Sequence, residues 1–179
     1  MKNLPTITVN GQKRYFLNGI GYGVDGYCCE KSDELKKKSG RRINYSLIAL
    51  RGLLFDYKPC NAVVTVDGEA YSYTHVLMSP VMNGRFYGGG VMIAPAQNRL
   101  NEEGTVTVVT VHDLEKCKAL FIFPKIYSVS HIRHTDVVAV HTGHEITVKF
   151  ENPTPLQIDG ETVSSVTKFT VESGVKNHN

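Results

Sequence analysis

Apolar and polar positions alternate in short runs along most of the chain, and turn residues separate these runs. Alternation with period two indicates strands, and an Asn-Gly or Asp-Gly pair between two such runs favours a tight hairpin turn. The sequence therefore predicts two hairpins: Thr6–Val9 with Arg14–Asn18 around Asn10-Gly11, and Ala62–Val66 with Ala70–Met78 around Asp67-Gly68. Further strand candidates are Gly90–Ile93, Thr105–Val111, Val137–Val140, Glu145–Phe150, Leu156–Ile158 and Val163–Val171. So many short strands predict a mainly β fold of the α+β class, built as a sandwich or a curled sheet.

Helical patterns are fewer than strand patterns. Ser32–Lys38 is rich in charged residues without an apolar stripe, which is typical of a solvent-exposed helix or an ordered loop. After Arg42, apolar residues recur at helical spacing from Ile43 to Leu54, so one face of that segment is expected to pack on the sheet. Leu114–Phe121 is a third candidate, with Asp113 as its cap or first-turn acid. We expect one domain over residues 1–179, with two or three peripheral helices.

Charge and composition narrow the class of protein. The chain carries 20 basic and 17 acidic side chains and a net charge of +3, without the polybasic tail that is typical of nucleic-acid binding. A mild attraction to anionic lipid surfaces remains compatible with this charge. The sequence lacks the apolar run of a signal peptide or a membrane span. Its four cysteines, none of them in a C-x-x-C pair, suit a reducing compartment, so we expect a cytoplasmic protein.

Two glycine-rich segments stand out. Gly21, Gly23 and Gly26 fit the letters of a dinucleotide-binding fingerprint, but they also suit a strand that leaves its sheet and approaches another backbone closely. The second segment contains the triplet Gly88-Gly89-Gly90. Each glycine costs about 1 kcal/mol relative to alanine when the chain is ordered, so a triplet is expected where φ is positive or where something approaches the main chain. This predicts either a loop that lines a cleft or a tight connection between edge strands.

The segment Asp159-Gly160-Glu161 is first of all a hairpin turn, and the chain supplies its own comparison, because Asp67-Gly68-Glu69 has the same letters. The letters alone do not separate the two. The histidine pairs His131/His134 and His141/His144 suggest a metal site, but positions three apart on a strand point to opposite faces, and no regular ligand spacing surrounds them. Neither a phosphate-binding P-loop pattern nor a nucleophile elbow occurs.

Four stretches together, in this order, resemble the C-terminal domain of the diacylglycerol kinase, sphingosine kinase and bacterial YegS-like lipid kinase family. They are Phe16–Asp25, Gly88–Pro95, Phe123–Ser128 with His131, and Leu156–Glu161. The resemblance implies a β-rich domain that forms the lipid-side wall of a cleft. An N-terminal α/β domain would bind ATP through a Gly-Gly-Asp-Gly-Thr loop, which this sequence lacks. We therefore expect the C-terminal half of an ATP-dependent lipid kinase that is inactive alone and that needs magnesium and the missing N-terminal domain.

The resemblance also implies roles for single residues. Asp159 would accept the proton of the lipid hydroxyl, and Glu161 would lie near the nucleotide or its magnesium. This chemistry suits phosphoryl transfer, which depends on positioning and charge neutralisation. Asp25 would face the polar head of the lipid, and Gly88, Gly89 and Gly90 would line the substrate side. Arg42, or Arg41 if the register slips, would contact nucleotide phosphates.

One stretch departs from the family pattern. The family commonly has Asp-Gly-x-Leu-Asp-Val after the Ala-Pro segment, and its first Asp helps to hold a structural magnesium ion. Here Glu103 stands in that position, within Glu102-Glu103-Gly104. A longer side chain changes the reach to a small octahedral ion. Glu103 is thus either a metal ligand or part of a solvated turn.

Three functions remain open at this point. The first is half of a lipid kinase that acts on diacylglycerol or a related lipid alcohol at a membrane surface, on the inner membrane face. The second is a stand-alone lipid-binding or dimerisation module without catalysis, for which a homodimer is expected. The third is a kinase of a soluble nucleotide such as NAD, because that superfamily has a related fold. The segment Phe123–Ser128 followed by His131 favours the lipid branch.

Overall fold

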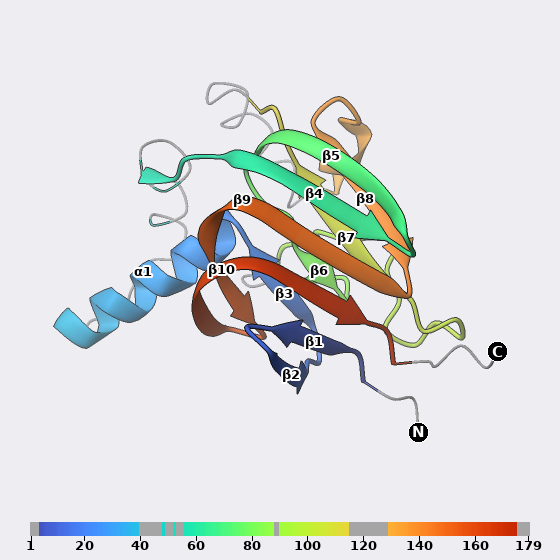
Figure 1. Cartoon of the computed structure of the whole chain (residues 1–179), viewed down its shortest axis with the longest axis horizontal. Coiled ribbons are helices and arrows are strands. Elements are labelled where there is room, and N and C mark those ends of the chain that lie inside the picture. The colour runs from blue at the N-terminus through green and yellow to red at the C-terminus, as the bar shows by residue number, and fades with distance from the viewer. Residues whose placement is uncertain are drawn as a thin grey trace.

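A strongly curved antiparallel sheet forms the body of the protein, and one long helix lies against it (Figure 1). This computed structural model describes residues 4–39, 48, 52, 56–87, 90–114 and 129–174. The strands are β1 (Thr6–Val9), β2 (Gln12–Tyr15), β3 (Gly19–Tyr22), β4 (Cys60–Val66), β5 (Glu69–Val76), β6 (Val81–Met82), β7 (Val106–Val111), β8 (Val138–Gly143), β9 (Glu145–Ile158) and β10 (Glu161–Glu172). The helices are α1 (Val24–Ser39) and a 3-10 turn, η4 (Ser130–Arg133). The mainly β class predicted from the sequence is confirmed.

The longest strand, β9, divides the sheet into two leaves: β4 and β5 form one, and β3, β6, β7 and β8 form the other. The sheet runs in the order β2-β1-β10-β9-β3-β6-β7-β8, and β4 also pairs with β9 and carries β5 outside it. The first part of β9, Ile146–Phe150, pairs with β4, whereas Leu156–Ile158 pairs with β3. Pro153 and Pro155 lie where the strand changes partner, because proline has no N–H for a ladder. The sequence predicted two separate strands, Glu145–Phe150 and Leu156–Ile158. That prediction is wrong, because the chain continues as one strand while it changes its partner from β4 to β3.

The core lies between these leaves. Strand β4 alternates buried and exposed positions, so Ala62, Val64 and Val66 face inward. Tyr22 is fully buried at the centre, with its ring 4.1 Å from that of Phe150 and 5.2 Å from that of Phe169. Its hydroxyl donates to the Val166 carbonyl at 2.6 Å, which satisfies the polar atom that burial would otherwise strand. Burial raises the pKa of the Tyr22 hydroxyl, so it stays protonated.

Helix α1 begins eight residues earlier than the charged Ser32–Lys38 segment suggests, at Val24. The sequence did not predict the first part of this helix, because Gly26, Cys28 and Cys29 lie in it and glycine and cysteine are poor helix formers. Val24 and Cys28 are buried in a second hydrophobic cluster. The polar side of α1 bonds to β10: Thr162 donates to Asp33 at 3.0 Å, and Ser164 donates to Glu30 at 2.7 Å.

The other predicted elements have mixed outcomes. Both hairpins are confirmed, with positive φ at Asn10-Gly11 and Asp67-Gly68. A strand over Gly90–Ile93 is wrong, since only an isolated bridge joins Tyr87 to Val91 there. Most of the helix candidates Ile43–Leu54 and Leu114–Phe121 lies outside the described residues. Across the described part of the chain, no helix combines the length and the apolar character needed to cross a membrane.

Candidate functional site

The turn between β9 and β10 fastens itself to the start of β3. Asp159 and Gly160 have φ of 48° and 96°, the left-handed conformation of a tight hairpin turn. The Asp159 carboxylate accepts backbone N–H groups from Leu17 at 2.6 Å, Asn18 at 2.9 Å and Gly19 at 3.0 Å. The Asp159 N–H donates in turn to the Gly19 carbonyl at 3.0 Å. The carboxylate is therefore held in one place at an exposed turn.

The Asp67 turn repeats this arrangement. Asp67 has φ of 48°, and its carboxylate accepts N–H groups from His144 at 2.9 Å and Glu145 at 2.7 Å. Its own N–H donates to the Glu145 carbonyl at 2.9 Å. Because β9 begins at Glu145 and ends at Ile158, the two turns lie at opposite ends of one strand. The two Asp-Gly-Glu segments thus share a local structure and differ only in their surroundings.

Asp25 lies close to the Asp159 turn, in the first turn of α1. Burial raises the pKa of its carboxyl group, and the neighbouring Tyr87 and Gln157 side chains partly offset this by favouring the charged form. The Tyr87 hydroxyl is itself buried, but no described residue completes a hydrogen bond with it in good geometry. A buried carboxylate and a buried tyrosine hydroxyl therefore lie together near the turn, and such a pair is suited to a polar ligand group.

The side chain of Gln157 joins Asp25 to the turn. Its Nε2 donates to Oδ2 of Asp25 at 2.9 Å, and its Oε1 accepts the Gly160 N–H at 2.6 Å. Gln157 is polar but buried, between Leu156 and Ile158, which belong to the apolar core. Sequence reasoning missed this residue. The signal that could have found it is a polar residue between two core residues of a strand.

The glycines before Asp25 make room for these contacts. A Cβ added at Gly21 would overlap Oδ2 of Asp25 and would lie 2.6 Å from Nε2 of Gln157. One added at Gly26 would overlap the Pro155 carbonyl of β9. The close-approach interpretation of this segment is confirmed. The dinucleotide-fingerprint interpretation is wrong, because β3 is antiparallel to both its neighbours and so belongs to no parallel βαβ unit.

Asn18 connects the Asp159 turn to the segment before the glycine triplet. Its Nδ2 donates to the Phe86 carbonyl at 2.8 Å, and its Oδ1 accepts from Arg99 at 2.9 Å. Its backbone carbonyl accepts N–H groups from Asn83 and Gly84, both at 2.9 Å. Segments far apart in the sequence therefore meet at Asn18. The sequence placed Asn18 within the Phe16–Asp25 stretch but indicated no role for it.

The triplet itself is only partly described. Gly88 and Gly89 lie outside the described residues. Gly90 has φ of 80°, so the predicted positive φ is confirmed at this position. The Tyr87 N–H donates to the Val91 carbonyl at 2.7 Å, so the residues on either side of the triplet are hydrogen-bonded to each other.

Glu161, the other acidic residue of the Asp159-Gly160-Glu161 segment, has a solvent-exposed side chain. The Glu161 side chain is 83% exposed, with an oxygen 4.0 Å from Nη1 of Arg14. Arg42 and Arg41 lie outside the described residues. The Glu161 carboxylate is thus accessible from solvent, although Arg14 lies beside it.

The turn that contains Glu103 is where the resemblance implies a structural magnesium site. Glu103 is exposed in a turn before Gly104, which has φ of 70°. Asn101 closes this turn by accepting the Thr105 N–H at 3.1 Å and donating to the Thr105 carbonyl at 3.3 Å. Within the described ranges, no three His, Cys, Asp or Glu residues are grouped for a metal ion. A hydrogen-bonded asparagine fastens this turn, so the solvated-turn interpretation is favoured.

Thiol chemistry and a shared histidine site are also disfavoured. Burial raises the pKa values of the Cys28 and Cys29 thiols to about 12, so both stay protonated and inert. His131 is buried with Nε2 3.0 Å from the Ile93 carbonyl, whereas His141 lies 2.7 Å from the Tyr73 hydroxyl. The two histidine pairs therefore have separate partners.

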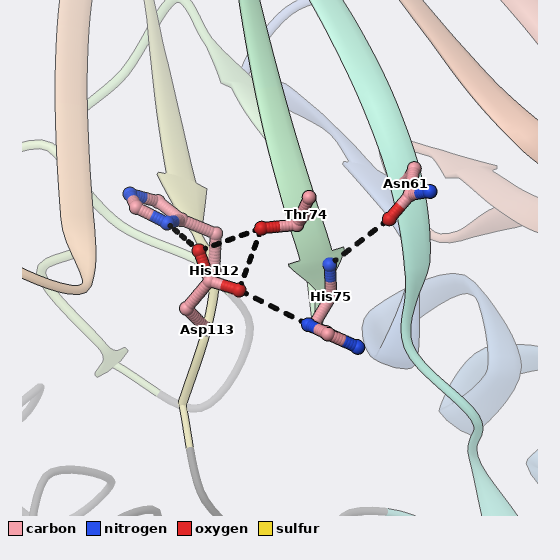
Figure 2. Close-up of polar contacts among 5 residues, drawn as sticks. All are labelled: Asn61, Thr74, His75, His112 and Asp113. Atoms are coloured by element: carbon pink, nitrogen blue, oxygen red, sulfur yellow. Dashed lines mark hydrogen bonds and ion pairs between the residues drawn. The ribbon is translucent and has the colours of Figure 1, made fainter.

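One polar cluster was not predicted, and it joins the ends of β5 and β7. Asp113 accepts from the Thr74 hydroxyl at 2.8 Å and lies 3.1 Å from Nδ1 of both His75 and His112. Figure 2 shows the two imidazole rings extending from this carboxylate in opposite directions, so their far nitrogens do not converge on a ligand. Mainly because of the His112 contact, the pKa of Asp113 is lowered to about 2. The sequence suggested Asp113 as the cap or first-turn acid of a helix over Leu114–Phe121, most of which lies outside the described residues; among those described, Asp113 bonds to β5.

Comparison with known proteins shows which family has this architecture. A family model described as the YegS C-terminal NAD kinase beta sandwich-like domain matches residues 18–174. The protein named "Putative lipid kinase YtlR" of Bacillus subtilis is 28% identical over 168 residues, which cover 89% of this chain and 52% of that protein. A diacylglycerol kinase of Mycobacterium tuberculosis is 25% identical over 128 residues, or 72% of this chain and 40% of that protein.

Solved structures agree on the fold. A crystal structure titled as a putative diacylglycerol kinase from Bacillus anthracis superposes with a TM-score of 0.65 at 20% identity, covering 97% of this chain and 54% of that one. A second structure of that description gives a TM-score of 0.61 at 19% identity. The chain spans about half the length of YtlR and of the Bacillus anthracis protein. It belongs to the family of the YegS C-terminal NAD kinase beta sandwich-like domain.

Proposed function

We propose that this chain is the substrate-side half of an ATP-dependent lipid kinase, which phosphorylates the hydroxyl of diacylglycerol or a related lipid. Family membership and the names of the relatives support the lipid kinase class. The observation that carries the proposal is the fixed carboxylate of Asp159 at an exposed turn, tied through Gln157 to the buried carboxylate of Asp25. Two carboxylates in contrasting environments are typical of sites that divide acid–base and binding roles.

Asp159 is proposed as the general base. Its Oδ1 accepts two backbone N–H groups, whereas Oδ2 accepts only the one from Leu17. Each carboxylate oxygen has two lone pairs, so Oδ2 keeps one for the proton of the lipid hydroxyl. As that O–H bond breaks, the lipid oxygen bonds to the terminal phosphorus of ATP, and ADP leaves with the electrons of the broken P–O bond. Holding the base in one position is the main contribution a protein makes to such a transfer.

The other groups of the site bind and orient the reactants. Asp25, with the buried Tyr87 hydroxyl beside it, is proposed to bind the polar head of the lipid. Glu161, exposed next to the turn, is proposed to face the nucleotide and its magnesium, together with Arg42. Gly88, Gly89 and Gly90 are proposed to line the substrate side. No step is assigned to Glu103.

A second domain completes the proposed enzyme. The relatives are about twice as long as this chain, so a nucleotide-binding half of similar size is the proposed partner. ATP and magnesium would bind mainly to that half, and magnesium would neutralise charge on the transferred phosphoryl group. The isolated chain is accordingly proposed to be inactive.

The proposed location is the cytoplasm, peripheral at the inner membrane face. Three side chains near the Asp159 turn are apolar and exposed: Leu17 at 57%, Phe86 at 48% and Leu100 at 73%. All three lie at or next to residues that bond to Asn18 or Asp159. Arg85 and Arg99 directly precede Phe86 and Leu100, and both are exposed. Apolar side chains flanked by arginines suit shallow insertion among anionic lipid headgroups.

The test combines the chain with the N-terminal half of YtlR, fused upstream or supplied separately. Phosphorylation of a short-chain diacylglycerol from radiolabelled ATP is expected from the combination but not from the chain alone. Asp159→Asn should lower the rate at least about 100-fold, the usual effect of losing a general base. Asp67→Asn is the matched control, because it alters the equivalent turn at the other end of β9. Normal turnover by the isolated chain, or by the Asp159→Asn variant, would contradict the proposal.

The same assay separates the alternatives. A stand-alone lipid-binding or dimerisation module would bind vesicles or self-associate, yet it would give no product with any nucleotide-binding half. Because the family description names an NAD kinase-like fold, NAD is included as an acceptor. Phosphorylation of NAD but not of diacylglycerol would favour the soluble-nucleotide alternative.

A further inference from the structure

Gln157 occupies a position that only an amide can fill. The ionised carboxylate of Asp25 accepts hydrogen bonds and cannot donate them, whereas the Gly160 N–H donates and cannot accept. Gln157 lies between them, with Nε2 2.9 Å from Asp25 Oδ2 and Oε1 2.6 Å from the Gly160 nitrogen. Glutamate would have no donor for Asp25, and leucine would satisfy neither neighbour. The orientation of the amide is therefore set by both neighbours, the Asp25 carboxylate on one side and the Gly160 N–H on the other.

The site is also closed around this side chain. Gln157 is 9% exposed, and residue 21 opposite it on β3 is a glycine, so β3 offers no side chain in its place. The Tyr87 hydroxyl also lies beside Asp25, but the contact to the Gly160 N–H is made by Gln157. On the other side, Gly160 follows Asp159 directly, and both lie in a turn with left-handed backbone angles. A change in the Gly160 hydrogen bond therefore acts on the backbone that carries the Asp159 carboxylate.

We propose that Gln157 is a positioning residue, whose amide couples the state of Asp25 to the placement of the Asp159 turn. A ligand group that pairs with Asp25, or a proton on it, weakens the hydrogen bond from Nε2 and so holds the amide less firmly against the Gly160 N–H. Binding at the Asp25 end is in this way transmitted to the base. The other titratable groups close to Asp25 are the Tyr87 hydroxyl and the Cys28 and Cys29 thiols. The catalytic meaning rests on the proposed lipid kinase function, whereas the coupling itself is a property of this chain.

The coupling is measurable without any kinase activity, by NMR of the isotope-labelled chain. The carboxyl carbon of Asp25 is titrated, and the Gly160 amide is followed in the same samples. In the wild type, the Gly160 amide shift is expected to have an inflection at the Asp25 midpoint, and Asp25→Asn should remove it, which separates it from the titration of Asp159. Gln157→Leu should abolish the inflection and raise the Asp25 midpoint by about one pH unit, because a hydrogen bond to the charged form is lost.

Two further variants control for damage to the fold. Thr147→Val removes a 2.8 Å hydroxyl contact to Thr170 near the other end of β9, and it should leave the Gly160 inflection unchanged. Gln157→Glu keeps an acceptor for the Gly160 N–H but loses the donor to Asp25, so it should raise the Asp25 midpoint while Gly160 stays hydrogen-bonded. This variant is informative even if Gln157→Leu does not fold.

The outcomes separate the two proposals. A wild-type Gly160 amide without an inflection at the Asp25 midpoint overturns the coupling, and so does an inflection that survives in Gln157→Leu. If the coupling is found but no nucleotide-binding half restores lipid phosphorylation, the proposed function fails and the coupling stands. In an active combination, Gln157→Leu should lower kcat about tenfold and shift the pH profile, whereas Thr147→Val should change neither.

Discussion

Asp67 and Asp159 have the same backbone conformation and the same kind of partners at opposite ends of β9. Both have φ of 48°, and both carboxylates accept backbone N–H groups from the residues that begin a neighbouring strand. The surroundings differ, because the Gly160 N–H beside Asp159 bonds to Gln157 and so connects with a buried second carboxylate. The hairpin turn is thus a shared structural device, and only its setting qualifies one copy as a site.

This equivalence predicts equal effects on stability. Asp67→Ala and Asp159→Ala each remove a carboxylate that bonds to backbone N–H groups, and each places alanine at a positive φ. We expect each to lower the free energy of unfolding by about 2 kcal/mol. The corresponding Asn variants should cost less, because asparagine tolerates the left-handed conformation. Urea unfolding measures all four, and a loss for Asp159→Ala alone would contradict the equivalence.

The closed space at Gly21 gives a second prediction. In Gly21→Ala, the new methyl group would overlap the Asp25 carboxylate, so we expect a loss of about 3 kcal/mol in stability. In an Asp25→Ala background the obstructing oxygen is gone, and the same substitution should cost clearly less. Thermal unfolding of the four proteins gives the coupling between the two positions. Additive losses would mean that the Asp25 carboxylate is not what obstructs the methyl group.

Local turn chemistry is what the sequence revealed best. Asn10-Gly11 and Asp67-Gly68 predicted both hairpins correctly, because these residues set the backbone angles of the turn by themselves. The sequence predicted β9 less well: two strands were expected, Glu145–Phe150 and Leu156–Ile158, whereas one strand continues through Pro153 and Pro155 and exchanges one partner for another. Which strands lie beside a proline is a tertiary fact that local pattern does not contain.

The site was only half predictable for the same reason. Asp25 and Asp159 were found through motifs, but their link was not, because Gln157 and Asp25 are 132 positions apart. The Asp113 cluster was missed likewise, since its His75 partner lies 38 positions away. Contacts of this kind depend on the folding of the whole sheet. The sequence can indicate a candidate only as a polar residue in an apolar strand, as at Gln157.

The apolar residues beside the Asp159 turn predict membrane binding. Leu17→Ser, Phe86→Ser and Leu100→Ser should each weaken co-sedimentation with anionic phosphatidylglycerol vesicles, by about threefold or more, because each removes buried apolar area at the interface. Leu35→Ser, Val63→Ser and Val140→Ser are matched controls, since these side chains are also exposed, at 43%, 38% and 43%, but lie elsewhere. Binding should fall at high salt and with neutral vesicles. Equal losses in both sets, or none, would contradict a membrane surface at this turn.

The Asp113 cluster predicts a dependence of stability on acidity. The folded pKa of Asp113 is lowered to about 2, whereas an unfolded aspartate titrates near pH 4, so the carboxylate contributes stability above about pH 4 and loses it as the pH falls toward 2. The contribution should be below about 1 kcal/mol, because the side chain is 42% exposed and solvent screens its contacts. Asp113→Asn should therefore unfold at a lower temperature than the wild type at pH 7.

The difference between these two proteins should shrink between pH 4 and pH 2, where the wild-type carboxyl group becomes protonated and loses the contacts that depend on its charge. Asp136→Asn, at another exposed aspartate, controls for the change in net charge. Thr74→Val keeps the carboxylate but removes its hydroxyl donor, so it should move the midpoint of this change to higher pH. A difference that stays constant from pH 7 to pH 2 would mean that Asp113 stabilises the protein through packing and not through its charge.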